Sequence, residues 1–188
     1  MIGLSLPKYN NKVIKIFLVM IVFLVACSPL PTSSPTPVLT PTASGQLIRE
    51  AETADEITTG DKDNIWRSNA SDQMVLGQFG CEGDSPYAAK PGYAKYIIEK
   101  IPRSTHLYLV VRFSKDTPAI KPIEVYIDDE TEPRASFYPT NQDDWNKFAE
   151  TERLDLGSIE AGDHILRFQT VGQQYGVADL DKFTLTGE

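Results

Sequence analysis

Short runs in which apolar and polar residues alternate constrain the fold of this chain more than any other feature. In residues 107–113 the apolar Leu107, Leu109, Val111 and Phe113 occupy every second position, and residues 123–127 repeat the pattern. Side chains two apart on a strand point to the same face, so each run has one continuous apolar face. Turn-forming residues separate the runs at intervals of about eight to twelve residues. The pattern predicts an all-β domain, an antiparallel β-sandwich.

The runs expected to form strands all follow residue 45. They are residues 47–53, 73–79, 93–99, 106–113, 123–127, 135–138, 153–156, 164–170 and 182–185. Residues 143–152 favour a short helix, and residues 80–92, which are rich in glycine and proline, favour a long loop. Two apolar residues of the last run, Leu180 and Phe183, are three apart, so a regular strand cannot bury both. We therefore expect this strand to begin near Asp181.

The segment before the domain has the features of an export signal. Three lysines precede an unbroken apolar run, residues 16–26, which is too short to span a bilayer but suits a signal peptide. Residues 24–27 read LVAC, which resembles the lipobox of bacterial lipoproteins. The resemblance implies cleavage after Ala26 and acylation of Cys27. Export without lipidation is the alternative.

Residues 28–45 hold five prolines among serines and threonines and carry no charge. Such a composition cannot form a core and is typical of an extended linker. We therefore divide the chain into a signal peptide (1–26), a lipidated cysteine with a linker (27–45) and a domain (46–188). This organisation predicts a lipid-anchored protein of the cell envelope, exposed outside the cytoplasm and attached to the membrane through its lipid alone.

The formal charge of −8 argues against a nucleic-acid partner, because phosphates would repel the protein. After Cys27, Cys81 is the one remaining cysteine, so no internal disulfide is expected and an inert thiol is favoured. Both histidines fall within expected strands, without the base and orienting group that nucleophilic catalysis needs. No phosphate loop or zinc spacing is present. We expect a protein that is not an enzyme.

Several local motifs follow one another along the expected domain: Glu50-Ala51-Glu52, Ser71-Asp72-Gln73, Val111-Arg112-Phe113, Tyr138-Pro139-Thr140 with Trp145, Gly162-Asp163-His164 and Asp179-Leu180-Asp181. Their order resembles that of the galactose-binding-like jelly-roll carbohydrate-binding modules, above all families six and thirty-five. The resemblance covers residues 47–188, nearly all of the expected domain. It implies a jelly-roll β-sandwich whose ligand is a polysaccharide or oligosaccharide.

The resemblance also implies a structural calcium near the first and last strands. Glu50 and Glu52 are two apart, so on a strand their carboxylates would project to one face, and Asp181 could supply a third oxygen. Calcium binds about six to eight oxygen ligands. The alternative is that these acids are solvated on an edge strand.

In the resembled modules the sugar lies in a loop-end site or on the concave face of a sheet. The loop-end version implies ligand contacts at Trp145, at Tyr87 and Tyr175 in loops, and at Asp179 just before the last strand. An aromatic ring suits the apolar face of a sugar. The family commonly has asparagine where this chain has Asp179, and a carboxylate cannot donate a hydrogen bond. Each aromatic could instead pack within a loop or the core, and Trp66 is expected to pack.

These features lead to one main hypothesis, a non-catalytic carbohydrate-binding module. It would be a monomeric domain that holds polysaccharide at the cell surface. The alternative is a structural or adhesion lipoprotein that uses the same fold to bind a protein or a cell-wall component.

Overall fold

The computed structural model describes residues 45–62, 65–82, 85–89, 91–101, 103–171 and 177–188, with the backbone alone for the described part of 81–90. The expected signal peptide and all but the last residue of the expected linker lie outside this range. No helix in the described part of the chain is long and apolar enough to cross a membrane.

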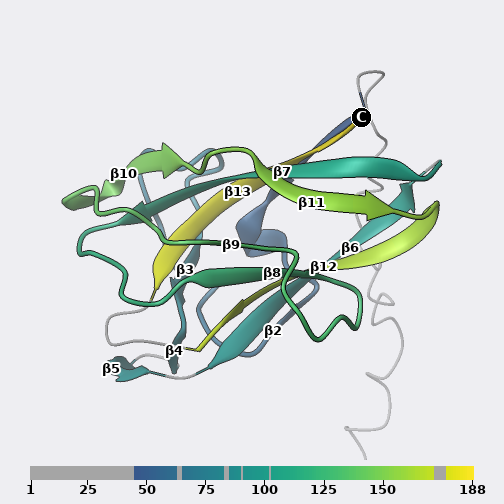
Figure 1. Cartoon of the computed structure of the whole chain (residues 1–188). Helices are drawn as coiled ribbons and strands as arrows, with labels where there is room; N and C mark the ends of the chain where they lie inside the picture. Colours follow the sequence, from purple (N-terminus) through teal and green to yellow (C-terminus); the bar gives the residue numbers. More distant parts are fainter. Residues whose placement is uncertain (1–44, 63–64, 83–84, 90, 102, 172–176) are drawn as a thin grey trace, which may run out of the picture. The chain divides into compact units, whose positions relative to one another are not determined.

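The described residues form strands and one 3₁₀ turn, η1 (Ala51–Thr53) (Figure 1). The strands are β1 (Gln46–Glu50), β2 (Glu56–Ile57), β3 (Leu76–Phe79), β4 (Cys81–Glu82), β5 (Ser85–Ala89), β6 (Gly92–Ile101), β7 (Thr105–Lys115), β8 (Ile123–Ile127), β9 (Ala135–Phe137), β10 (Asp144–Glu150), β11 (Leu154–Ile159), β12 (Gly162–Thr170) and β13 (Ala178–Gly187).

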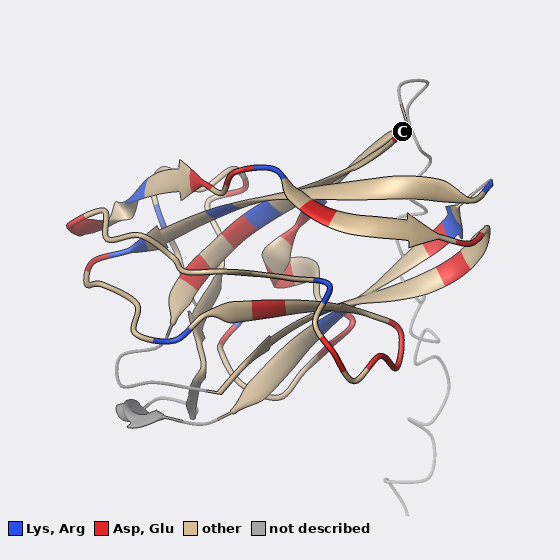
Figure 2. Cartoon of the chain, viewed as in Figure 1, with Lys and Arg blue, Asp and Glu red and all other residues tan. Residues whose placement is uncertain are grey.

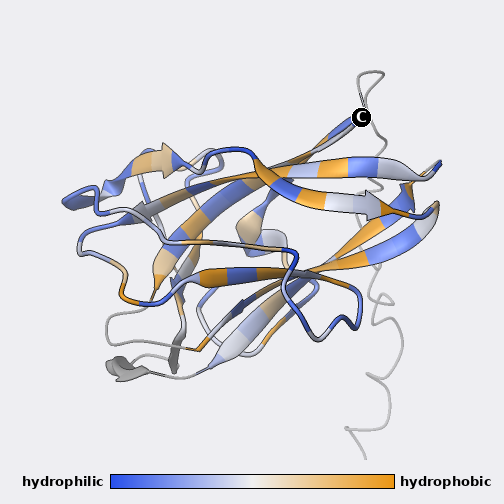
Figure 3. Ribbon diagram, viewed as in Figure 1, coloured by the Kyte–Doolittle hydropathy of each residue, from blue (hydrophilic) through white to orange (hydrophobic). Residues whose placement is uncertain are grey.

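Within the described residues these strands form two antiparallel sheets and one small hairpin. Sheet A has the order β1-β13-β7-β10, with β3 also paired to β13 and β11 also paired to β7. Sheet B has the order β2-β6-β12-β8-β9, and β4 pairs with β5. Figure 3 shows the alternation of hydrophobic and hydrophilic residues along the strands of both sheets. The predicted antiparallel sandwich is confirmed.

Three aromatic rings join the two sheets in the core. Tyr96 of β6 and Phe168 of β12 belong to sheet B, and Phe183 of β13 belongs to sheet A; all three are buried. Their ring centroids lie 4.8 to 5.7 Å apart in edge-to-face arrangements, the geometry that aromatic quadrupoles favour. The Tyr96 hydroxyl donates to the carbonyl of Ala51 at 2.7 Å, so its polar tip is satisfied inside the core.

The expected elements need several corrections. Residues 143–152 are not a helix, because β10 pairs with the free edge of β7 and this pairing outweighs the local sequence pattern. The expected loop 80–92 contains the β4–β5 hairpin. The first strand ends at Glu50, and Glu52 lies in η1, so the two acids do not share one strand.

The last strand begins at Ala178 rather than near Asp181. Its register against β7 shifts between Leu180, which faces Phe113, and Lys182, which faces Arg112. Asp181 is the extra residue of this β-bulge, and a bulge changes which residues share a face. Leu180 and Phe183 are therefore both buried although they are three apart.

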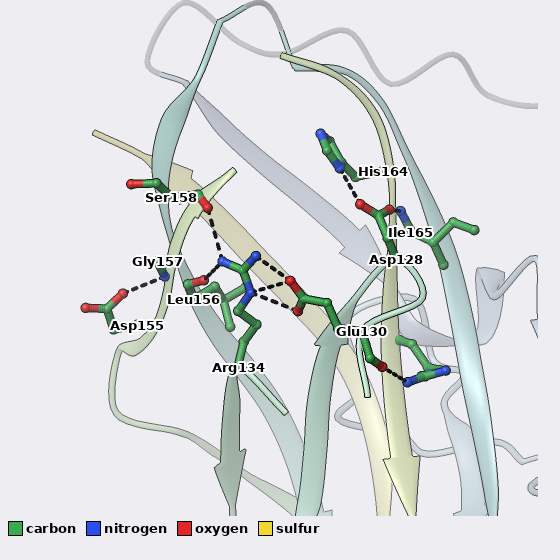
Figure 4. A network of polar contacts seen from close by, with 10 residues as sticks. Asp128, Glu130, Arg134, Asp155, Leu156, Gly157, Ser158, His164 and Ile165 are labelled. Atoms are coloured by element: carbon green, nitrogen blue, oxygen red, sulfur yellow. Dashed lines mark hydrogen bonds and ion pairs between the residues drawn. The ribbon is translucent and has the colours of Figure 1, made fainter. Parts of the chain in front are cut away.

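A polar network joins the turn between β8 and β9 to neighbouring strands (Figure 4). Arg134 binds Glu130 and donates to the carbonyls of Leu156 at 2.8 Å and Ser158 at 3.1 Å, which belong to β11 of the other sheet. The turn is the acidic stretch drawn in red beside β8 in Figure 2. Arg134 thereby links the edge of sheet B to sheet A.

His164 lies in the same region with an acceptor at each ring nitrogen. Its Nδ1 is 2.8 Å from Oδ2 of Asp128, and its Nε2 is 3.0 Å from the carbonyl oxygen of Glu160. Burial by itself would lower the pKa of His164, but the hydrogen bonds with Asp128 and Glu160 and the charges of Asp128 and Asp163 raise it above its usual value. A ring that donates from both nitrogens is the imidazolium form.

Replacing Tyr96 with phenylalanine should lower the free energy of unfolding by about 1 to 2 kcal/mol, because the buried carbonyl of Ala51 loses its donor. Urea denaturation would measure the change. Tyr138, an exposed tyrosine just after β9, provides the control, and Tyr138→Phe should be neutral. Equal midpoints for Tyr96→Phe and wild type would contradict this role.

The imidazolium of His164 should stabilise the fold at low pH. Because its pKa is raised in the folded state, the contribution is full below about pH 6.5 and is lost as the pH rises through the folded-state value. The stability difference between wild type and His164→Gln should therefore shrink from pH 6 to pH 8.5 in urea titrations. Asp128→Asn, which keeps the ring but removes the facing charge, should weaken this pH dependence. A difference that is constant with pH would refute the assignment.

Candidate functional site

The topology gathers several connections at one end of the sandwich, which we call the loop end. The β7–β8 and β9–β10 connections lie there together with the end of β12 and the start of β13, because β7 and β12 end where β10 and β13 begin. The β4–β5 hairpin joins the same end, since Phe79 pairs with Ala178 and Gly92 pairs with Thr170. In Figure 1 this end lies on the left, with β10 and β5. Gly45 lies at the opposite end, beside Gly187.

The predicted ligand residues belong to these elements. Tyr87 is in β5, where the backbone alone is described, and Trp145 is in β10. Asp179 is in β13. Tyr175 lies outside the described residues, in the connection between β12 and β13. The fold therefore brings the segments of Tyr87, Trp145 and Asp179 to one end, as the loop-end hypothesis requires.

Trp145 is half-buried at the start of β10 and has two cationic neighbours. The guanidinium carbon of Arg67 lies 5.5 Å from the centre of its ring, and Nζ of the buried Lys115 lies 5.1 Å away. Cations within about 6 Å of an aromatic centroid are attracted to the ring. The indole is thus held in place by charged groups from β7 and from the segment before β3.

Asp179 is a buried residue of β13, whereas the sequence predicted that it lies in the loop before that strand. Its side chain is 0% exposed, and its Oδ2 accepts from Arg67 Nε at 2.8 Å and lies 2.6 Å from Arg67 Nη2. Its Oδ1 accepts from the backbone N–H of Gln78 at 2.9 Å. Burial raises the pKa of Asp179, while Arg67 and the Gln78 N–H oppose that shift. The group nearer to solvent is Arg67, with 22% of its side chain exposed.

Trp66 was expected to pack, yet it is 58% exposed. Its backbone forms a bridge with Met74, its ring N–H donates to Gln73 Oε1 at 3.4 Å, and its carbonyl accepts from Arg67 at 3.4 Å. Arg67 therefore contacts the backbone of Trp66 and the ring of Trp145. The sequence did carry a signal, since Trp66 stands in a polar stretch without alternation that offers no apolar face to bury it.

The loop of residues 66–73 is pinned to sheet A along its length. The backbone N–H and the hydroxyl of Ser68 donate to Asn146 Oδ1 at 3.0 and 3.1 Å. The Asn69 amide donates to the Asn146 carbonyl at 3.0 Å, and the Asn69 carbonyl accepts from Arg112 at 3.1 Å. These bonds fix the backbone that carries Trp66 and Arg67.

The acids expected to bind calcium gather at the other end of this loop. Asp181 is buried and ion-paired with Arg112, and its Oδ1 accepts from the Ser71 N–H at 2.7 Å. The Ser71 hydroxyl contacts both Glu50 and Asp181. Ser71 therefore joins Glu50 to Asp181, while Glu52 lies in η1, beyond the end of β1, and does not share a strand face with Glu50.

Glu52 has the least compensated carboxylate of this group. Its Oε2 is buried without a hydrogen-bond partner. The pKa of Glu52 is raised to about 7, chiefly by burial, with a backbone hydrogen bond opposing the shift and the charges of Glu50, Asp72 and Asp181 adding to it. Within the described residues, no three His, Cys, Asp or Glu side chains converge closely enough to form a ready metal cage. The donor chemistry suits a hard cation, but Asp181 is engaged by Arg112.

Comparison of the sequence with protein-family models and with curated proteins finds no match. Comparison of the structure with solved structures does find similar chains. A family 35 carbohydrate-binding module from Clostridium thermocellum superposes with a TM-score of 0.57 and 15% identity, covering 74% of this chain and 96% of the module.

Two further modules match over a similar extent. A family 35 module from Paenibacillus barcinonensis has a TM-score of 0.55, with 14% identity over 75% of this chain and 98% of the module. The C-terminal family 6 module of a laminarinase from Zobellia galactanivorans has a TM-score of 0.55, with 11% identity over 75% of this chain and 98% of that module. The chain therefore has the antiparallel jelly-roll fold of the family 35 and family 6 carbohydrate-binding modules.

Proposed function

We propose that residues 46–188 form a non-catalytic carbohydrate-binding module that holds a polysaccharide at the loop end. The observation that carries this proposal is the half-buried Trp145 ring with the Arg67 guanidinium 5.5 Å from its centre, next to the exposed Trp66 in the same loop as Arg67. A sugar ring offers an apolar C–H face to an aromatic side chain and hydroxyl groups to fixed polar partners. The loop end supplies both kinds of group on a backbone held by sheet A.

The fold supports this proposal, because the solved modules that share it are carbohydrate-binding modules. The amino-terminal pattern adds a location. Acylation at Cys27 and an extended linker over residues 28–45 would hold the domain at the cell envelope, outside the cytoplasm. The domain would then bind its glycan at a distance from the membrane.

A protein or cell-wall partner is the second candidate function. Three apolar side chains, Ile120, Tyr138 and Val171, are exposed on or beside the loop-end connections. Contiguous exposed apolar groups mark interaction surfaces of proteins, and these three residues belong to segments at the same end of the sandwich. A surface of this kind could serve adhesion instead of sugar binding.

We also propose that Glu50, Glu52 and Asp181 hold a structural calcium ion. Calcium would supply the positive charge that the buried Glu52 oxygen lacks and would relieve repulsion among these carboxylates. Binding requires Asp181 to exchange part of its contact with Arg112 for the ion. The role is structural, and the glycan contacts are assigned to other residues.

Removing either tryptophan should weaken glycan binding at least about tenfold, because aromatic anchors commonly contribute more than about 1.4 kcal/mol each. Affinity electrophoresis on a panel of galactan, laminarin and polygalacturonate would compare Trp66→Ala and Trp145→Ala with wild type. Tyr108→Ala alters an aromatic residue of β7 that pairs with Asp155 of β11, away from the loop end, and should leave binding unchanged. Retention of no glycan by the wild type, or full retention by both tryptophan variants, would contradict the proposal.

Calcium should raise the melting temperature, and EDTA should reverse the rise. Glu52→Gln should abolish this calcium dependence, since it removes one anionic ligand, and should raise stability in EDTA by relieving repulsion. Glu152→Gln, which changes an exposed acid between β10 and β11, is the matched control and should keep the full calcium response. Identical melting curves in calcium and EDTA would rule out the site.

A further inference from the structure

We infer that Arg67 is the polar side chain through which the loop end contacts its glycan, and that Asp179 acts by positioning Arg67. This inference rests on the proposed carbohydrate-binding function and assigns the roles within that site. The sequence suggested instead that Asp179 itself contacts the sugar. The first reason is access: Asp179 is 0% exposed, whereas Arg67 reaches solvent.

The hydrogen bonds of Asp179 give the second reason. One of its oxygens faces two nitrogens of Arg67, and the other accepts from the Gln78 N–H. A ligand would have to displace a buried ion pair to reach this carboxylate, and breaking such a pair leaves an uncompensated charge. Asp179 therefore has the surroundings of a support for Arg67.

Arg67 retains donors for a ligand. A guanidinium has five N–H groups, two on each terminal nitrogen. The contacts with Asp179 and with the Trp66 carbonyl engage Nε, Nη2 and Nη1 once each, and each terminal nitrogen has a second N–H. The guanidinium also lies 5.5 Å from the Trp145 ring centre. A sugar stacked beside Trp145 would meet these donors at its edge.

A sugar contact through Arg67, instead of through the residue at position 179, determines which groups the ligand must present. Asn both donates and accepts, but a guanidinium only donates, so the sugar must present oxygen acceptors to it. Adjacent hydroxyl oxygens or a sugar carboxylate can both do so, and a carboxylate can form two parallel bonds with the guanidinium. Galactan and laminarin offer hydroxyl oxygens alone, whereas polygalacturonate also offers carboxylates. Comparing their binding therefore distinguishes the two kinds of acceptor.

A double-mutant cycle tests the inference, with galactan, laminarin and polygalacturonate as probes and affinity electrophoresis as the measurement. Arg67→Gln should weaken retention of the polysaccharide that wild type binds at least tenfold. Asp179→Asn should also weaken it, but should add less than twofold in the Arg67→Gln background, because Asp179 acts through Arg67. Arg67→Lys should recover little, since lysine lacks the planar fork.

Arg153 supplies the matched control. It also lies over an aromatic ring, that of Tyr108, and pairs with a carboxylate, Glu188, away from the loop end. Arg153→Gln should bind as wild type does. Arg67→Gln leaves the buried Asp179 unpaired and could therefore unfold. The double variant Arg67→Gln/Asp179→Asn has neither charge and still tests the contact. Its binding should be at least tenfold weaker than that of wild type.

The outcomes separate the two hypotheses. Wild-type affinity in Arg67→Gln or in the double variant, with loss in Trp145→Ala, would overturn the role of Arg67 and leave the carbohydrate-binding function intact. A further loss of tenfold or more on adding Asp179→Asn to Arg67→Gln would make Asp179 a direct contact. Retention of none of the three polysaccharides by wild type would overturn both the function and the inference.

Discussion

Two buried carboxylates on β13 determine where the 66–73 loop packs against sheet A. Asp179 and Asp181 are both inaccessible to solvent, and an unpaired buried charge is costly. Arg67 and the Gln78 N–H satisfy the first, and Arg112 and Ser71 satisfy the second. Of these partners, Arg67 and Ser71 lie in one loop. The position of the 66–73 loop is therefore a consequence of electrostatic compensation.

The same loop links the two sites. Its residues Arg67 and Ser71 are four apart and bind acids that are two apart on β13. Arg112 adds a further tie, because it pairs with Asp181 and also donates to the carbonyl of Asn69. The tryptophans and the acidic cluster thus share one backbone support. Precise placement of Trp66 depends on this support, since the Trp66 side chain itself is largely exposed.

Sequence patterns predicted the sandwich because its long strands, such as β6, β7 and β12, bury one face each. They failed where a distant partner decides the structure. β10 is a strand because the edge of β7 is free to pair with it, and no local pattern records that edge. The bulge at Asp181 likewise depends on pairing with β7. In a regular strand Leu180 and Phe183 could not share a face. The sequence pattern therefore predicted a strand that begins near Asp181, with Asp179 in the loop before it.

Some residues of the candidate site could be predicted from the sequence, and others could not. Trp145 and Asp179 were expected at one site, and the fold brings both beside Arg67. Arg67 itself could not be found from the sequence, because it lies 112 positions from Asp179 and belongs to no alternating run. Trp66 was expected to pack, although its polar stretch without alternation offers no apolar face to bury it. The roles of calcium and of the glycan contacts stay predictions.

The place where the chain joins the domain has a mechanical consequence. Gln46 pairs with Thr186 and Glu50 pairs with Lys182, so β1 runs from the end opposite the loops toward the loop end. A pull through Gly45, resisted by a ligand held among the loops, would act along β1. The hydrogen bonds between antiparallel strands are perpendicular to the strands. All the bonds between β1 and β13 would then be loaded together in shear, and the strand would resist detachment more strongly than one peeled away bond by bond.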